Sequence, residues 1–236
     1  MPLFKNLFGT ESSTIKKTCV VVPFLPKGLL KKLGIETLKR GTLYSTANTD
    51  TFTFIKAGIG TLLVGDAVLY LEQTQCKNII YFGSCGLVRE TDRLTLGSLV
   101  CPEKCFSFES FTDVITGQMC NVSTQYPGYN LLQTFLDMST SRNIRSVTGI
   151  SIGSLKCEES YKKFFLEKGV EVIDMECSAF FSAAHSIQKD ALAILYATDI
   201  ITQKPLFTPL EPESRLLIDN AIHTACKVIR LFCTRQ

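Results

Sequence analysis

Runs of apolar residues suited to buried strands alternate along this chain with segments in which apolar residues recur at helical spacing. The strand-like runs cover residues 18–22, 42–46, 51–57, 78–82, 98–101, 144–152, 170–173 and 191–197. Helices are predicted at 27–33, 61–73, 129–138, 158–168 and 213–232, with another that follows residue 173 and extends to His185. Because several strands are apolar throughout, the alternation predicts an α/β fold with a twisted, mostly parallel central sheet flanked by helices.

The pattern indicates one domain. Residues 105–128 are rich in Ser, Thr, Phe and Gly, and we expect a loop with some β-structure there. No repeat, low-complexity linker or shift in composition divides the chain. We therefore predict a single domain over residues 18–236, preceded by an N-terminal extension over residues 1–17 to which we assign no function.

Composition excludes several classes of protein. The net charge of +3 is small and its lysines are scattered, which argues against nucleic-acid binding. No window approaches the roughly 18 uninterrupted apolar residues of a membrane span, and the N-terminus lacks a secretory signal. The ten cysteines lie mostly in apolar strands and helices, which indicates reduced core residues of a cytoplasmic protein. With two histidines, neither near a cysteine pair, no metal site is predicted.

The stretch from Val170 to His185 carries the first candidate chemistry. An apolar strand passes directly into an Ala- and Phe-rich helix, and Asp174, Met175 and Glu176 lie at the junction. A carboxylate at a helix start is stabilised by free backbone N–H groups and the helix dipole. Capping and a functional role therefore carry about equal weight for these two acids.

Other candidates also follow predicted strands, where ligands bind in open α/β sheets. Two glycine loops, Gly58-Ile-Gly60 and Gly83-Ser-Cys-Gly86, match neither a nucleophile elbow nor a phosphate-binding or dinucleotide fingerprint, and each could be a simple turn. Asp199 comes directly after an apolar strand, where partial desolvation would raise its pKa and suit it to proton donation. The alternative is that it caps a following helix, which Pro205 and Pro209 disfavour.

Several of these stretches together resemble the nucleoside phosphorylase and nucleosidase superfamily, which includes purine nucleoside and uridine phosphorylases and methylthioadenosine/S-adenosylhomocysteine nucleosidases. The resemblance covers residues 18–232 in the family's order. It is carried by Arg40-Gly41, Gly58-Ile-Gly60, Ile80-Tyr-Phe-Gly-Ser-Cys-Gly86, Val172-Ile-Asp-Met-Glu176 and Thr198-Asp199.

The resemblance implies a role for each matching position near the nucleoside. Glu176 would bind the ribose hydroxyls, Met175 would pack under the sugar, and Ile173 would line the base. Asp199 would protonate the purine as it leaves. These roles suit cleavage of an N-glycosidic bond, in which positive charge develops on the sugar and negative charge on the base.

The resemblance also implies a pocket for phosphate or a nucleophilic water, formed by Ser84, Gly60 and Arg40, with the arginine reaching a neighbouring subunit. Two features depart from the family. Tyr81 stands where a phosphate-binding arginine is usual, and residues 22–26 (Val-Pro-Phe-Leu-Pro) contain neither that loop's arginine nor a nucleosidase's water-activating glutamate. The lost arginines count against phosphate, whereas the retained Arg40 and Ser84 count for it, and the balance slightly favours hydrolysis.

We therefore expect an enzyme that cleaves the N-glycosidic bond of a nucleoside, with purine and hydrolysis favoured. The alternatives are a phosphorylase that uses phosphate as co-substrate, and a non-catalytic nucleoside-binding or scaffold protein on the same fold. The resemblance implies a homo-oligomer and no metal or redox cofactor.

Overall fold

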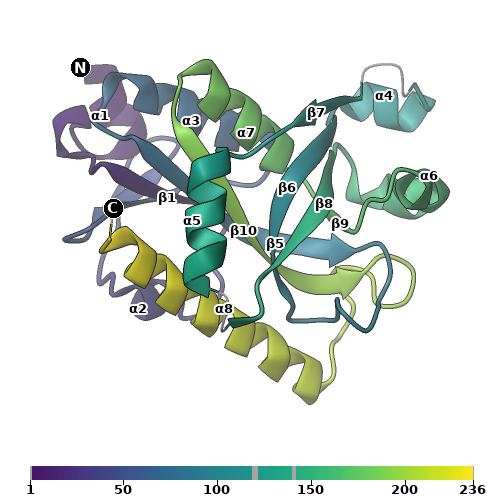
Figure 1. Cartoon of the computed structure of the whole chain (residues 1–236). Coiled ribbons are helices and arrows are strands. Elements are labelled where there is room, and N and C mark those ends of the chain that lie inside the picture. The colour runs from purple at the N-terminus through teal and green to yellow at the C-terminus, as the bar shows by residue number, and fades with distance from the viewer. Residues whose placement is uncertain (1, 119–121, 140–141, 236) are drawn as a thin grey trace.

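The computed structural model of the protein describes residues 2–118, 122–139 and 142–235 (Figure 1). Within them, ten strands form one sheet. They are β1 (Thr18–Val22), β2 (Lys39–Arg40), β3 (Ser45–Asn48), β4 (Thr53–Lys56), β5 (Asn78–Leu87), β6 (Leu99–Phe108), β7 (Ser123–Gln125), β8 (Arg145–Ile152), β9 (Val172–Asp174) and β10 (Asp190–Ile200). The α/β class with a central sheet flanked by helices is thus confirmed.

The sheet is mixed rather than purely parallel. Its order is β10-β6-β8-β9-β5-β1-β4-β3-β2, with β7 on β6. Strand β10 also pairs in parallel with β5, so β10, β6, β8, β9 and β5 close into a ring. The antiparallel pairs within this ring are β10–β6 and β5–β9. The predicted strands 42–46 and 51–57 are present as β3 and β4, which pair antiparallel.

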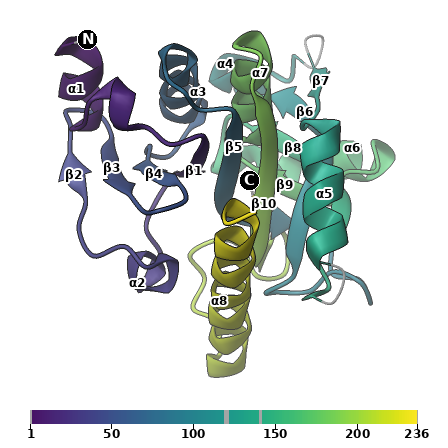
Figure 2. The same ribbon diagram turned by 60° about the vertical axis from the view of Figure 1, so that its left-hand side comes forward.

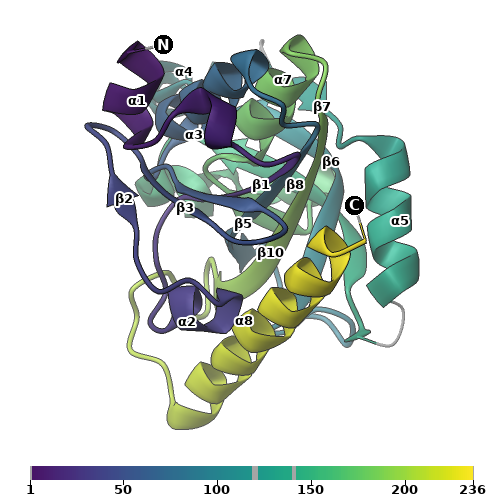
Figure 3. The same cartoon turned by 90° about the vertical axis from the view of Figure 1, so that its left-hand side faces the viewer.

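Helices cover both faces of the sheet (Figures 1 to 3). On one side α1 (Pro2–Phe8), α3 (Thr61–Leu69) and α7 (Cys177–Ser186) share a buried apolar cluster with the sheet. On the other side α2 (Leu29–Leu33), α5 (Tyr129–Ser139) and α8 (Pro212–Cys233) share a second one. A smaller cluster lies under α4 (Phe111–Thr116) and α6 (Lys162–Glu167). The helices thus bury the apolar stripes that the sequence pattern predicts.

The N-terminal extension packs onto the domain. Phe4 and Phe8 of α1 are 4% and 0% exposed, and the Phe8 ring lies 4.5 Å from that of Tyr44. A short 3-10 helix, η1 (Ser12–Thr14), then leads into β1. Residues 2–17 are therefore continuous with the core.

Strand β5 is longer than the sequence pattern suggests. The expected strand 78–82 continues through the glycine segment to Leu87, so these glycines lie in a strand and not in a turn. The reason at Gly83 is close approach, because a Cβ atom there would lie 2.7 Å from the Tyr81 ring. Strand β10 likewise extends past Asp199 to Ile200, with a bulge between Ala197 and Asp199.

The region 105–128 is more regular than expected. Strand β6 runs through to Phe108, α4 follows, and β7 returns antiparallel to β6. Residues 119–121 of this region lie outside the described part of the chain. The predicted helix 158–168 begins as a 3-10 turn, η4 (Leu155–Tyr161), before α6.

The nine described cysteines are free thiols, eight of them buried. In residues 2–118, 122–139 and 142–235, no helix is long and apolar enough to cross a membrane. The same residues contain no cluster of three or more His, Cys, Asp or Glu side chains that could hold a metal ion.

Candidate active site

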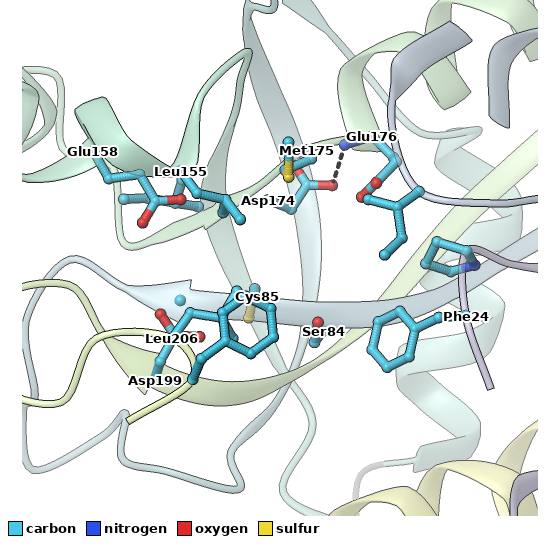
Figure 4. Close-up of a pocket in the computed structure, with 15 residues that line it drawn as sticks. Phe24, Ser84, Cys85, Leu155, Glu158, Asp174, Met175, Glu176, Asp199 and Leu206 are labelled. Carbon is cyan, nitrogen blue, oxygen red and sulfur yellow. Dashed lines mark hydrogen bonds between the residues drawn. The ribbon is translucent and has the colours of Figure 1, made fainter. Parts of the chain in front are cut away.

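A cavity of about 180 Å3 lies where several strands end (Figure 4). The ends of β5, β9 and β10 contribute to it, as do the segments that follow β1, β4 and β10. Ligand sites in α/β sheets form at such carboxyl ends. The lining residues are Pro23, Phe24, Ile59, Ser84, Cys85, Gly86, Leu155, Glu158, Ile173, Asp174, Met175, Glu176, Asp199, Leu206 and Phe207.

The two acids at the start of α7 have different roles. Asp174 is a cap, since its Oδ2 accepts hydrogen bonds from the backbone N–H groups of Glu176 (2.9 Å) and Cys177 (2.6 Å). Its Oδ1 accepts a hydrogen bond of 2.6 Å from the Ser151 hydroxyl. Burial raises the Asp174 pKa, and these three donors oppose the rise. The capping interpretation is therefore correct for Asp174.

Glu176 is held by groups from two other elements. Its Oε1 accepts a hydrogen bond of 2.7 Å from the Gly60 N–H, and its Oε2 accepts one of 2.9 Å from the Tyr81 hydroxyl. The side chain makes no capping bond and faces the cavity. Each carboxylate oxygen has a second lone pair, so the group remains able to accept from a ligand.

The electrostatics of Glu176 follow from this position. Burial, and next the negative charge of Asp174, raise its pKa to about 7, whereas the hydrogen bonds from Gly60 and Tyr81 oppose the rise. The residue is 5% exposed. Gly60 can present its N–H here because it adopts φ 105° at the start of α3, a conformation that side chains disfavour.

Asp199 lies at the opposite end of the cavity from Glu176 (Figure 4). The bulge in β10 precedes it and places it opposite Gly86 of β5. Its Oδ1 accepts a hydrogen bond of 2.7 Å from the Thr198 hydroxyl. Burial raises its pKa, and the Thr198 hydrogen bond opposes the rise. Because Asp199 lies inside a strand, it does not cap a helix, and its environment has the desolvation that the sequence predicted.

Glu158 is a lining carboxyl group that the sequence pattern did not single out. It comes from η4 and lies at the same end of the cavity as Asp199 (Figure 4). Burial, and next the charge of Asp199, raise its pKa to about 8. The sequence signal was weak, since Glu158 and Glu159 resemble ordinary surface residues of a helix start.

Only some of the other predicted site residues line the cavity. Ser84, Met175 and Ile173 line the cavity, with Ser84 and Met175 between the two acidic ends (Figure 4). Gly60 is not among the lining residues, and its N–H already donates to Glu176. Arg40 is exposed on β2, at the far edge of the sheet, and does not line the cavity of its own chain.

The charged side chains among the described lining residues are all acidic. Four carboxyl groups line it, and no Lys, Arg or His is among the described lining residues. Tyr81, at a position where a cation would suit phosphate, instead donates to Glu176. Between the acids the walls are mainly apolar, which strengthens every charge interaction with a bound ligand.

Comparison with known proteins agrees with this architecture. The family model described as Phosphorylase superfamily matches residues 17–231. No curated protein sequence gave a significant match.

Solved structures are similar in fold at low sequence identity. Uridine phosphorylase from Vibrio fischeri superposes with TM-score 0.79 at 17% identity, covering 96% of this chain and 95% of that one. The 5′-methylthioadenosine/S-adenosyl homocysteine nucleosidase of Campylobacter jejuni gives 0.73 at 14%, covering 94% and 100%. AMP nucleosidase from Bacteroides thetaiotaomicron gives 0.70 at 14%, covering 97% and 95%. The chain, from β1 almost to the end of α8, belongs to the phosphorylase superfamily.

Proposed function

We propose that this protein hydrolyses the N-glycosidic bond of a nucleoside, with a purine base favoured. The observation that carries the proposal is the arrangement of Asp199 and Glu176 at opposite ends of one largely apolar cavity. The family membership supports N-glycosidic chemistry in general. Structural neighbours include both a uridine phosphorylase and nucleosidases.

Asp199 is the general acid in this proposal. Burial raises the pKa of Asp199, which favours the protonated form that a general acid needs. As the bond between C1′ and the base nitrogen breaks, its electron pair moves to the base, and the Asp199 proton neutralises the developing negative charge. Water adds its oxygen to C1′, and the proton it releases returns Asp199 to the acid form.

Glu176 is the ribose anchor. Gly60 and Tyr81 fix the orientation of its carboxylate, and the free lone pairs accept from the sugar hydroxyls. A negative charge beside the sugar also stabilises the positive charge that develops there in the transition state. Met175 and Ile173 pack against the sugar and base, and Ser84 holds the attacking water midway between the acids.

The absence of a cation among the described lining residues supports hydrolysis over phosphorolysis. Inorganic phosphate carries negative charge, and no basic side chain among the described lining residues would offset that charge. Arg40 is the observation that keeps a phosphorylase as second candidate, because its exposed position on β2 would let it reach a neighbouring subunit in a homo-oligomer.

Product analysis with a panel of nucleosides, run with and without phosphate, tests the proposal. We expect free base and free ribose at equal rates in both conditions. Base released only with phosphate, alongside ribose 1-phosphate, would establish the phosphorylase instead. A nucleoside that raises the melting temperature but is never consumed would establish a non-catalytic binding protein.

A further inference from the structure

Glu158 is an acid in the cavity wall to which the chain itself gives no partner. It is half-buried, and no hydrogen-bond donor or cation of the described residues contacts its carboxylate. Because Glu158 is only half-buried and lines the cavity, its oxygens can accept hydrogen bonds from a ligand there. Its neighbour Glu159 is exposed, as expected for a solvated charge.

The free acceptor atoms at this end of the cavity form a group. In Figure 4, Glu158 comes from η4 on one wall and Asp199 from β10 on the other. The Thr198 hydroxyl donates a hydrogen bond to Asp199 Oδ1, whereas no described donor is bonded to Asp199 Oδ2. One Asp199 atom and both Glu158 oxygens therefore remain for a ligand that enters between the two walls.

The two carboxyl groups are coupled electrostatically. Burial, and next the charge of Asp199, raise the pKa of Glu158 to about 8, and burial also raises the pKa of Asp199. The other ionisable groups that line the cavity are Cys85, Asp174 and Glu176. Lys162 of α6 donates a hydrogen bond of 2.6 Å to the Thr202 hydroxyl and forms no ion pair with either carboxyl group. A pair with one proton offers one donor and adjacent acceptors.

We propose that Glu158 determines base specificity by accepting a hydrogen bond from an exocyclic amino group adjacent to the ring nitrogen that Asp199 protonates. The substrate class is then a nucleoside with an amino-substituted base, and a 6-aminopurine fits best. This inference rests on the proposed function, because it assigns the base to the end of the cavity where Asp199 is the acid.

The preference for an amino group would follow from the arrangement of polar groups along one edge of the purine base. In a purine, the ring nitrogen N7 and the substituent on C6 lie side by side, so Asp199 and Glu158 can contact both at once. An amino group donates to ionised Glu158, and this leaves the proton on Asp199, where catalysis needs it. A 6-oxo group turns an acceptor toward Glu158, so Glu158 must keep the proton and Asp199 is left without one.

Adenosine and inosine differ in this substituent and give a direct test. The kcat/KM ratio of adenosine to inosine should be at least about tenfold in the wild type. Glu158→Gln should lower the ratio by about 10- to 100-fold, because an amide can turn either its oxygen or its NH2 toward the base. Glu159→Gln, one residue away and outside the cavity, is the matched control and should leave the ratio unchanged.

A second readout separates specificity from a structural effect. Calorimetry with the free bases adenine and hypoxanthine should show a preference for adenine that widens from about pH 6 to about pH 8, as Glu158 loses its proton. In Glu158→Gln the preference should be small and flat with pH.

Each result decides the question. Equal use of adenosine and inosine, or an unchanged ratio in Glu158→Gln, would overturn the role of Glu158 and leave glycosidic cleavage standing. If the wild type cleaves no nucleoside, the proposed function fails. The calorimetry then decides alone: an adenine preference that Glu158→Gln removes supports the role, and equal affinities overturn it.

Discussion

Gly86 and Asp199 pair across β5 and β10 with no space for another atom between them. A Cβ atom on Gly86 would lie 2.6 Å from Asp199 Oδ2. The backbone of Gly86 does not adopt a positive φ, so the requirement for glycine is one of space and not of conformation. Gly86 therefore fixes where the proposed acid can lie.

Gly86→Ala should reduce kcat by about 100-fold, because displacement of a catalytic group by about 1 Å has effects of that size. Gly65→Ala in α3 is the control, since its new Cβ would lie 4.0 Å from Ala179. That variant should keep full activity and gain about 0.5–1 kcal/mol in free energy of unfolding. Steady-state kinetics and thermal melts of both proteins would measure this. Full activity in Gly86→Ala would show that Asp199 has no fixed role.

Asp199→Asn should bind nucleoside as the wild type does and lose about 100- to 10,000-fold in turnover, because an amide has no proton of suitable acidity to give. Binding is measured by calorimetry and turnover by release of free base. Asp190→Asn, at the exposed start of the same strand, serves as control and should turn over normally. Undiminished turnover in Asp199→Asn would remove Asp199 from the mechanism.

Tyr81→Phe should raise KM for the nucleoside about 3- to 10-fold at neutral pH. The Tyr81 hydroxyl stabilises the ionised form of Glu176, so its loss should raise the Glu176 pKa above about 7 and leave less carboxylate to bind ribose. The KM should recover as pH rises, because Glu176 then ionises again.

Measurement of KM across a pH series checks this, and Tyr196→Phe is the control. Tyr196 is also buried in the sheet, packs against Phe82 at 5.4 Å, and lies outside the cavity. The ring of Tyr81 packs against Phe180 and remains in the phenylalanine variant, so folding should be preserved. A pH-independent rise in KM would contradict the proposed link to Glu176 ionisation.

The folded protein should lose stability as pH rises from about 5 to about 8. Burial raises the pKa to about 7 in Glu109, about 8 in Glu158 and about 7 in Glu176, so the folded state holds more protons than the unfolded chain in this range. Stability is then fully present below the ordinary glutamate pKa and is lost as pH passes through the raised values.

Urea denaturation at several pH values measures this slope. Glu109→Gln should flatten it, because the amide does not titrate, whereas a change at exposed Glu159 should not. The Glu109 carboxylate accepts a hydrogen bond from Ser178, which a glutamine oxygen can also accept. Stability that rises over the same range would show that these acids are not buried in solution.

Much of the fold could be predicted from the sequence because its signals are local. Apolar runs and helical spacing identified most strands and helices, but not α1, β2, α4 or β7. An acid after an apolar run marked Asp199 correctly as a partly desolvated group. The points at which strands end were less predictable from the sequence. Strands β5 and β10 continue through glycines and a bulge, because neighbouring strands supply hydrogen bonds that local sequence does not reveal.

The roles within the site could not be predicted in the same way. Asp174 and Glu176 lie two residues apart at the same helix start, and local chemistry treats them alike. Glu176 is separated from Gly60 by 116 positions and from Tyr81 by 95, and these two contacts direct it to the cavity while Asp174 caps the helix. The sequence showed Tyr81 only as the replacement of a usual arginine, whereas in the structure its hydroxyl donates a hydrogen bond to Glu176.

The sequence by itself therefore determined the α/β architecture and the positions of the acids at strand ends, since both follow from periodicity and from neighbours along the chain. Only the tertiary structure decided that β10 and β5 close a ring, that Glu158 joins Asp199, and that no described cation lines the cavity. Burial and charge environment depend on groups brought together from distant segments, and those contacts exist only after the chain has folded.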